Sequence, residues 1–194
     1  MRDLSKELQC ALTRWSSYEK LVAAESIIRN AVERNPLHTD LEQVLEKVSL
    51  INELYSAGVQ DIVAMAEHIL LLQNLDSLLK DGDLNVVENI ANYETSVSRK
   101  KIRCYSFATK YCAFHNPIKY PIYDKFVAQR VLELTREIGY HVTAMELKKY
   151  TRFKDAIDRI IAVFCLENDY NKVDKYLWLQ HLESADSVWN NGCH

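Results

Sequence analysis

The sequence predicts an all-α, multi-helix globular protein, and three observations favour that class. Apolar residues recur at three- and four-residue spacing along most of the 194-residue chain, as in helices that bury one face. Glycine and proline are scarce, with 4 and 3 copies, so few positions suit the tight turns of a strand meander. The composition, 48% hydrophobic and 26% charged, is that of a chain able to bury its own core.

The helices of the first half are delimited by residues that favour helix ends. Ser16 or Ser17 is a plausible N-cap between the first two helices, and Pro36 ends the second because the residue before proline avoids the helical basin. Thr39 or Asp40 is a plausible cap of the next helix, and Gly58 a plausible stop. The expected segments are 4–15, 16–35, 39–58, 61–79 and, after a turn, a short helix ending near residue 92.

The second half continues the pattern with four more helices, and only residues 139–145 hint at a strand. We expect one helical domain over residues 1–194. Its parts would be an N-terminal helical part at 1–98, a motif-bearing helix-loop-helix at 99–138 and C-terminal helices at 139–194. The four helices are expected at 99–114, 124–138, 151–166 and 171–182.

Several classes of protein are disfavoured. The most apolar stretch, residues 62–75, is interrupted by Glu67, His68 and Gln73, so no membrane span is expected, and no secretion signal is visible. The five cysteines are odd in number and lack CxxC spacing, which favours reduced thiols in a cytoplasmic protein. The six histidines form no HxxxH or HExxH pattern. We therefore expect no metal and no cofactor.

Basic residues are concentrated between Arg99 and Arg130. This stretch holds eight lysines and arginines and one acid, Asp124, a net charge of +7 that leaves −10 for the rest of the chain. Cations interleaved with Tyr and Phe are typical of a nucleic-acid contact surface, although a solvated helix face produces the same pattern. The candidate phosphate contacts are Arg99, Lys100, Lys101, Arg103, Lys119 and Lys125.

The helix expected at 99–114 carries Lys110 near its end. One face, formed by Cys104, Phe107, Ala108 and Tyr111, has the spacing of a core face. The opposite stripe holds Lys100, Arg103, Ser106 and Lys110, and it is either simply solvated or functional. In the functional interpretation, a lysine amine partly withdrawn from water near the end of an aromatic helix acts as a nucleophile.

Asp124 precedes a segment with apolar residues on one side, so it is expected at the N-terminus of a helix. Aspartate is a favoured N-cap, and that role alone explains it. Helix N-terminal amides also keep a carboxylate ionised, and a fixed anion can stabilise a developing cation. The intervening loop must turn at Asn116-Pro117 and again at Pro121, which would allow Lys110 and Asp124 to approach each other.

The segments "FATKYCAF", residues 107–114, and "PIYDKFV", residues 121–127, resemble the helix-hairpin-helix DNA glycosylase superfamily. They are most similar to reduced bacterial 8-oxoguanine DNA glycosylase-like proteins, in which a "TK" helix is followed by an Asp-x-x-Val helix start. The resemblance implies that Lys110 attacks the sugar carbon and that Asp124 stabilises the positive charge as the glycosidic bond breaks. It also implies a DNA substrate with a damaged base.

This chain departs from that superfamily in three ways. No glycine precedes Lys110 in "IRCYSFATK", so a phosphate grip would fall to Arg103, Lys101 or Ser106. The spacing from Lys110 to Asp124 is shorter than in the larger enzymes, and there is no cysteine cluster for an iron–sulfur centre.

A flipped base would need an aromatic pocket. The candidate pocket residues are Phe107, Phe114, His115, Tyr123 and Trp178. For Trp178 core packing is an open alternative, and for His115 an interaction with the helix dipole.

Two functional hypotheses stand at this point. The first is a DNA N-glycosylase with associated lyase activity at abasic sites, carried by Lys110 and Asp124. The second is a catalytically silent helical module that binds nucleic acid or a partner protein through residues 99–130. A small accessory structural protein is a third alternative. DNA is the expected partner in the first case, and neither hypothesis involves a membrane or a metal.

Overall fold

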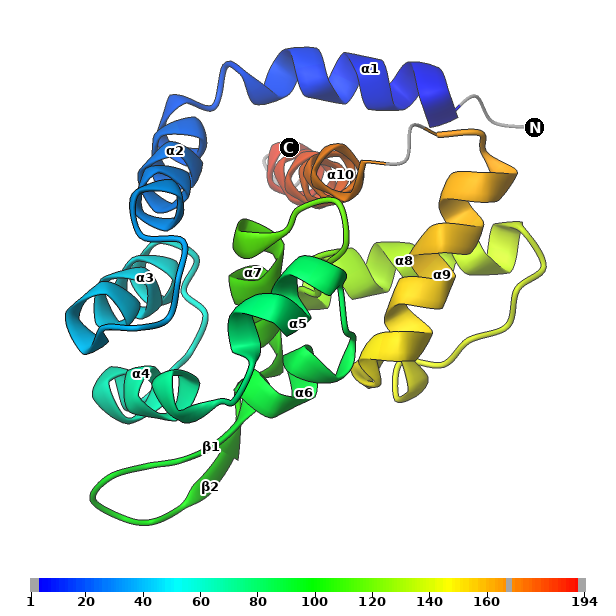
Figure 1. The fold of residues 1–194 in the computed structure, drawn as a ribbon. Coiled ribbons are helices and arrows are strands. Elements are labelled where there is room, and N and C mark those ends of the chain that lie inside the picture. Colours follow the sequence, from blue (N-terminus) through cyan, green and yellow to red (C-terminus); the bar gives the residue numbers. More distant parts are fainter. Residues whose placement is uncertain (1–3, 167–168, 192–194) are drawn as a thin grey trace. The chain divides into compact units, whose positions relative to one another are not determined.

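The computed structural model describes residues 4–166 and 169–191, with side chains described as far as residue 181. This described part contains ten α-helices and one two-stranded sheet, which confirms the all-α class (Figure 1). The chain divides into two compact units, Glu19–Ile122 and the combination of Met1–Tyr18 with Tyr123–His194. The boundary after Ile122 lies inside the motif-bearing segment expected at 99–138. The expected single domain stays a prediction.

The unit Glu19–Ile122 is built around its last helix, α7 (Tyr105–His115). Helices α2, α3, α5 and α6 all pack against α7, which therefore has almost no face left for solvent. The other elements of this unit are α2 (Glu19–Arg34), α3 (Leu41–Leu54), α4 (Ile62–Leu71), α5 (Leu75–Asp81), α6 (Asn85–Ala91), β1 (Asn92–Glu94) and β2 (Lys101–Arg103).

The helix expected at 61–79 is two helices in the structure. Asn74 has φ +58°, a left-handed conformation that asparagine tolerates, and α4 and α5 meet there at an angle of 85°. The N-terminus of α4 is capped by Asp61, whose side chain accepts from the amide of Ala64. The expected cap at Asp40 is confirmed, since it accepts from the amide of Gln43 at the start of α3.

The helix expected from residue 99 begins only at Tyr105. Lys101–Arg103 instead pairs antiparallel with Asn92–Glu94, and residues 95–100 form the connecting loop. The physical reason lies in the run Thr95-Ser96-Val97-Ser98, in which polar and β-branched residues favour turn and strand over helix. The predicted polar stripe of Lys100, Arg103, Ser106 and Lys110 is therefore wrong, because only its last two members are helical.

The turn after α7 caps the C-terminus of α5. A helix leaves its last carbonyls without intrahelical donors, and here Asn116 donates to the carbonyls of Leu79 and Lys80 at 3.0 Å. The hydroxyl of the buried Tyr120 donates to the carbonyls of Leu78 and Asp83, at 3.2 and 3.0 Å. Asn116 is thus a tertiary contact as well as the residue that turns the chain before Pro117.

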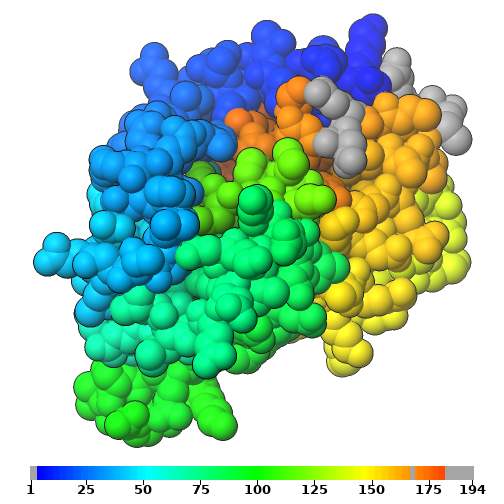
Figure 2. All heavy atoms as spheres, viewed as in Figure 1, coloured from blue at the N-terminus to red at the C-terminus, as the bar shows by residue number. Residues whose placement is uncertain are grey.

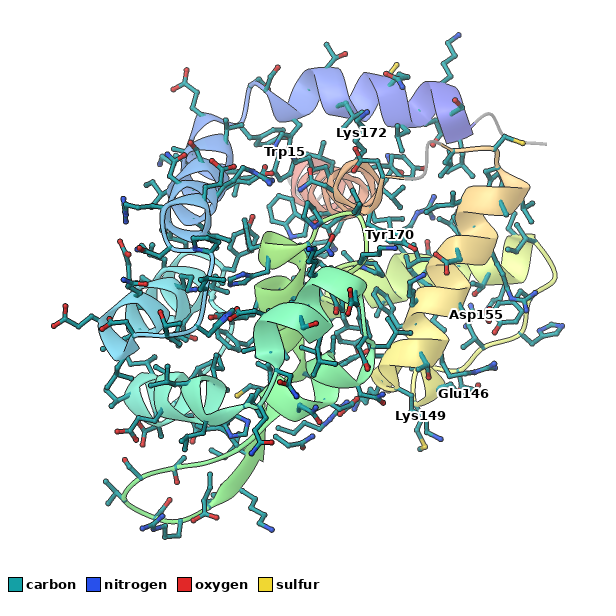
Figure 3. All side chains as sticks on the ribbon, in the orientation of Figure 1. Trp15, Glu146, Lys149, Asp155, Tyr170 and Lys172 are labelled. Atoms are coloured by element: carbon teal, nitrogen blue, oxygen red, sulfur yellow. The ribbon has the colours of Figure 1, made fainter. Side chains whose placement is uncertain are left out.

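The second unit consists of α1 (Leu4–Trp15), α8 (Lys125–Glu137), the short 3-10 helix η1 (Glu146–Lys148), α9 (Tyr150–Val163) and α10 (Tyr170–Asn191). Helix α10 packs against α1 and α8, and α9 packs against α8. The Tyr176 hydroxyl donates to the Glu7 carboxylate at 3.0 Å, joining α10 to α1. Trp15, labelled in Figure 3 at the end of α1, meets Trp178 edge to face at 6.0 Å.

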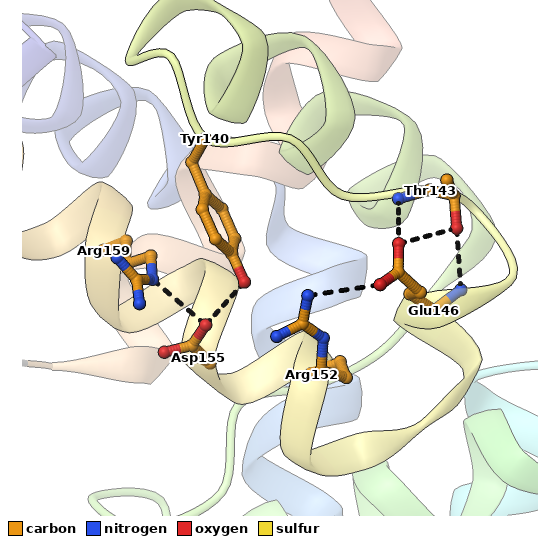
Figure 4. Close-up of polar contacts among 6 residues, drawn as sticks. All are labelled: Tyr140, Thr143, Glu146, Arg152, Asp155 and Arg159. Carbon is orange, nitrogen blue, oxygen red and sulfur yellow. Dashed lines mark hydrogen bonds and ion pairs between the residues drawn. The ribbon is translucent and has the colours of Figure 1, made fainter.

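The strand hinted at 139–145 does not form. That connection is attached to α9 by polar contacts instead (Figure 4). The Tyr140 hydroxyl donates to Asp155 at 2.6 Å, and Glu146 accepts from the Thr143 amide and from Arg152. These side-chain bonds give the segment local partners, so it needs no neighbouring strand.

No single helix between residues 4 and 191 combines the length and hydropathy needed to cross a bilayer. Helices α4 and α5 reach that hydropathy only together, across their 85° bend.

The cap on α5 leads to a stability prediction. Tyr120→Phe keeps the buried ring but removes the donor to two carbonyls, so it should lower the free energy of unfolding by about 1 to 3 kcal/mol. Chemical denaturation followed by circular dichroism measures this. Tyr18→Phe is the matched control, because the described residues provide no partner for the Tyr18 hydroxyl, and it should change stability little. Equal stabilities of the two variants would contradict the role of Tyr120.

Candidate functional site

The aromatic segment singled out in the sequence is the core helix α7. Nine of its eleven residues are buried, and only Ser106 and His115 are partly exposed. The predicted core face is confirmed, since Cys104, Phe107, Ala108 and Tyr111 are all buried. The density of aromatic residues follows from packing on every side of the helix.

Lys110 is buried within this helix, with 3% of its surface exposed. Its Nζ donates to Ser106 Oγ, one turn earlier, at 2.6 Å. The same atom lies 6.0 Å from the centre of the Tyr55 ring, and that ring meets Phe114 edge to face at 5.6 Å. Lysine is rarely buried to this extent in proteins.

Asp124 has the expected position at the start of a helix. It is the N-cap of α8, with φ −132° and ψ 156°, and its Oδ1 accepts from the Phe126 amide at 2.9 Å. It belongs to the second unit, whereas Lys110 belongs to the first.

The excess of positive charge after residue 99 is partly neutralised by acids that precede it in the chain. Arg103 makes two hydrogen bonds to Glu88, at 2.6 and 3.1 Å, and stacks on Tyr105. The Arg99 guanidinium lies 3.6 Å from the Glu94 carboxylate, measured between Nη1 and Oε1. The count of a single acid between residues 99 and 130 missed both partners, because Glu88 lies on α6 and Glu94 on β1, upstream of the counted stretch.

The remaining predicted phosphate contacts are spread over several elements. Lys100 and Lys101 are exposed on the hairpin, with no carboxylate at ion-pairing distance among the described residues. Ser106 is engaged by Lys110 rather than exposed as a free phosphate grip. Lys119 is exposed in the turn after α7, and Lys125 is exposed on α8 with its Nζ 4.5 Å from the centre of the Phe126 ring.

The predicted base-pocket residues each have an aromatic neighbour in their own unit. Phe107 and Phe114 are buried in α7 and pack near Tyr111 and Tyr55, respectively. In the second unit, Tyr123 meets Phe153 edge to face at 5.2 Å, and Trp178 meets Trp15. The structure groups Phe107, Phe114 and His115 in one unit, and Tyr123 and Trp178 in the other. Their role in holding a base stays a prediction.

A buried polar cluster surrounds the last turn of α7. His38 Nδ1 lies 2.5 Å from Asp76, its Nε2 lies 2.9 Å from the Tyr111 hydroxyl, and its ring is 4.7 Å from the ring of His115. The Nε2 atom of His115 is buried and has no hydrogen-bond partner among the described residues. Burial lowers the pKa of both histidines, although Asp76 opposes the shift at His38.

The nearby Lys47 is a second buried lysine of this unit. Its Nζ donates to the carbonyls of Asn35 and Leu37 at 2.9 and 3.1 Å, so it completes the chain reversal after α2. Burial lowers its pKa to about 8. Lys47 is therefore occupied by backbone carbonyls, whereas Lys110 is held by a side-chain hydroxyl.

The described residues contain no group of three or more His, Cys, Asp or Glu side chains arranged to hold a metal ion. Cys10, Cys104, Cys112 and Cys165 are free thiols, and Cys193 lies outside the described residues.

Comparison with known proteins places the chain in a family. The model of an N-terminal domain family, HI_0787_N, matches residues 7–119. The chain belongs to the HI_0787_N family. An uncharacterized protein of Haemophilus influenzae is 35% identical over 142 residues, which cover 73% of this chain and 67% of the relative. No solved structure matches the chain. The part matched by HI_0787_N includes Lys110 and the cluster around His38, and it ends before Asp124.

Sequence reasoning missed Tyr55 and the cluster around His38. Tyr55 directly follows α3, inside the segment 39–58 that was expected to be one helix, and nothing local indicates a partner on α7. His38 follows Pro36 in a loop, and its contacts to Asp76 and Tyr111 join residues far apart in sequence. Such pairings depend on tertiary packing, which helical spacing does not encode.

The buried histidines make the stability of this unit dependent on pH. Because folding lowers the pKa of His38 and His115, the unfolded chain binds protons near its ordinary value of about 6.5, whereas the folded chain does not. The free energy of unfolding should therefore fall as the pH drops below about 6.5, by up to about 1.4 kcal/mol per pH unit for each histidine.

Denaturation curves between pH 7 and pH 5 measure this dependence. His115→Phe should flatten it, because the substitution removes one buried titrating ring whose Nε2 makes no hydrogen bond among the described residues. His141→Gln, at an exposed position, is the control and should leave the slope unchanged. A parent protein equally stable at both pH values would contradict the account.

Proposed function

We propose that the protein releases a damaged base from DNA through nucleophilic attack by Lys110. The observation that carries the proposal is the burial of this amine on α7, where it donates to the Ser106 hydroxyl and lies near the Tyr55 ring. A lysine costs free energy to bury, and the motif around it resembles that of base-excising enzymes. A surface lysine kept only for solubility would not need this environment.

The proposed reaction needs no group from outside the chain. The lone pair of the Lys110 amine attacks C1′ of the damaged nucleotide, and the bond from C1′ to the base breaks with its electron pair leaving on the base. The amine passes one proton to the departing base and its second proton to the ring oxygen O4′, so that the C1′–O4′ bond breaks and the opened sugar is held as an imine. Loss of a proton from C2′ of this imine forms a C2′–C3′ double bond and breaks the C3′–O bond, so that the strand is cleaved with the 3′-phosphate as leaving group; this is the proposed lyase activity. Ser106 orients the amine by accepting its hydrogen bond.

The resemblance assigns to Asp124 the stabilisation of positive charge on the sugar as the base departs. Its cap hydrogen bond from the Phe126 amide holds the carboxylate in place.

A second function is favoured by the exposed Lys100 and Lys101. In this alternative the protein is a silent module that binds nucleic acid through the hairpin without chemistry. This alternative predicts that the protein binds DNA in a salt-sensitive way, releases no base and forms no covalent adduct through Lys110.

The imine provides the test of the first function. With borohydride present, duplexes containing 8-oxoguanine, uracil or an alkylated adenine should yield a protein–DNA adduct. Lys110→Gln should abolish that adduct while leaving the circular dichroism spectrum unchanged, because glutamine still bonds Ser106 but carries no nucleophile.

Lys80→Gln, an exposed lysine on α5, is the matched control and should retain the adduct. An adduct on an abasic duplex does not identify Lys110 as the nucleophile, because the abasic aldehyde reacts with many exposed lysines. Adduct formation that survives Lys110→Gln, or no release of any base in the panel, would exclude the proposed chemistry.

Asp124→Asn separates catalysis from structure. Asparagine caps helices about as well as aspartate, so stability should change by less than about 1 kcal/mol. Base release should slow by about tenfold or more with little change in DNA affinity, because the carboxylate acts on the cationic transition state. Single-turnover rates and binding isotherms measure the two effects. A loss confined to affinity would assign Asp124 to binding.

A further inference from the structure

The β1–β2 hairpin projects from the unit Glu19–Ile122 beyond α4, and its side chains form a protrusion in the space-filling view (Figure 2). Val97, in the connecting loop, is 94% exposed. Among the large apolar residues that the structure describes as exposed, none has a higher exposed fraction. This valine contributes nothing to the core of either unit.

The loop that carries Val97 is held in a defined conformation. The amide of Thr95 donates to the Lys100 carbonyl at 3.0 Å, and its hydroxyl lies 2.7 Å from the Ser98 hydroxyl. Arg99 adopts a left-handed conformation with φ +51°. The amide and hydroxyl of Ser96 both donate to Asp61, at 3.0 and 2.6 Å, which ties the loop to the start of α4.

Positive charge follows directly after the exposed valine. Arg99 has 81% of its side chain exposed, and Lys100 and Lys101 are also exposed. From Thr95 to Arg103 there is no acidic residue, and the nearest described partner of Arg99 is Glu94 at 3.6 Å. The loop thus presents one apolar side chain next to three cations.

We propose that this hairpin is a wedge for duplex DNA. Val97 enters the base stack from the minor groove, and Arg99, Lys100 and Lys101 contact the flanking phosphates. The choice of DNA as partner rests on the proposed function, in which a base leaves the stack. An extruded base leaves a gap, and an apolar side chain that fills it offsets part of the cost of unstacking.

The same lysines have a simpler use, since charge on an exposed edge strand opposes edge-to-edge aggregation. That use requires neither an exposed valine beside them nor any affinity for DNA. A DNA experiment with separate variants of the valine and the lysines therefore distinguishes the two roles.

The experiment uses the full chain and a duplex that carries 2-aminopurine opposite a tetrahydrofuran abasic analogue. Binding is followed by fluorescence anisotropy and unstacking by 2-aminopurine emission. Lys100→Glu/Lys101→Glu should weaken binding at least tenfold and reduce the slope of log K against log salt by about 2. Val97→Ser should keep that slope and lose most of the emission increase.

Matched controls come from the same unit. Lys20→Glu/Lys80→Glu carries the same change of charge at exposed positions outside the hairpin, and Leu71→Ser removes another exposed apolar side chain. Both should behave as the parent. Arg103 is left unchanged in these variants, because its side chain pairs with Glu88.

The wedge is overturned if the parent does not bind the duplex, if the lysine variant binds as well as the parent, or if Val97→Ser leaves the emission unchanged. The proposed function is judged separately, by base release from the duplexes that contain 8-oxoguanine, uracil or an alkylated adenine. Base release through Lys110 without Val97-dependent emission removes the wedge alone, whereas Val97-dependent emission without release of any base removes the glycosylase alone.

Discussion

The structure of the unit Glu19–Ile122 depends on the burial of α7 against α2, α3, α5 and α6. A helix enclosed in this way cannot place polar side chains in water, so each needs an internal partner. Lys110 is paired with Ser106, and Tyr111 with His38. The polar groups of α7 are therefore fixed by the same packing that forms the core, and this packing positions the amine that we propose as the nucleophile.

The buried groups differ in how completely they are satisfied. Lys47 binds two backbone carbonyls and has a structural role in the turn after α2. His115 stands between His38 and Tyr111 with a buried nitrogen that has no hydrogen-bond partner in the described part of the chain. Unpaired buried nitrogen is costly, and the neutral form of the ring minimises that cost.

Local signals predicted the features that are local in physical origin. The caps at Asp40 and Asp124 and the core face of α7 were readable because capping and helical periodicity act within a few residues. The break at Asn74 was not, since its left-handed backbone is one of several conformations open to asparagine. The hairpin at 92–103 was missed because β2 fell within a segment expected to be helical, and because β1, with three residues, is too short for its alternation to stand out.

Charge was the least predictable property of the site. A window of the sequence from residue 99 to 130 shows one acid, yet Glu88 and Glu94 lie against Arg103 and Arg99. Arg103 of β2 pairs with Glu88 of α6, and Arg99 of the connecting loop pairs with Glu94 of β1, so a count along the sequence overstates the positive charge of this region. Among the cations that the fold leaves exposed, Lys100 and Lys101 are in the hairpin, whereas Lys119 and Lys125 are in the turn after α7 and on α8.

The proposed base release and strand cleavage both depend on Lys110 as the nucleophile. The most direct measurement is to digest a borohydride-trapped adduct, formed on a damaged-base duplex, and to locate the modified lysine by peptide mass spectrometry. The account predicts a reduced sugar fragment on Lys110, in the peptide that contains α7. Modification of Lys100, Lys101 or Lys119 with Lys110 unmodified would contradict it.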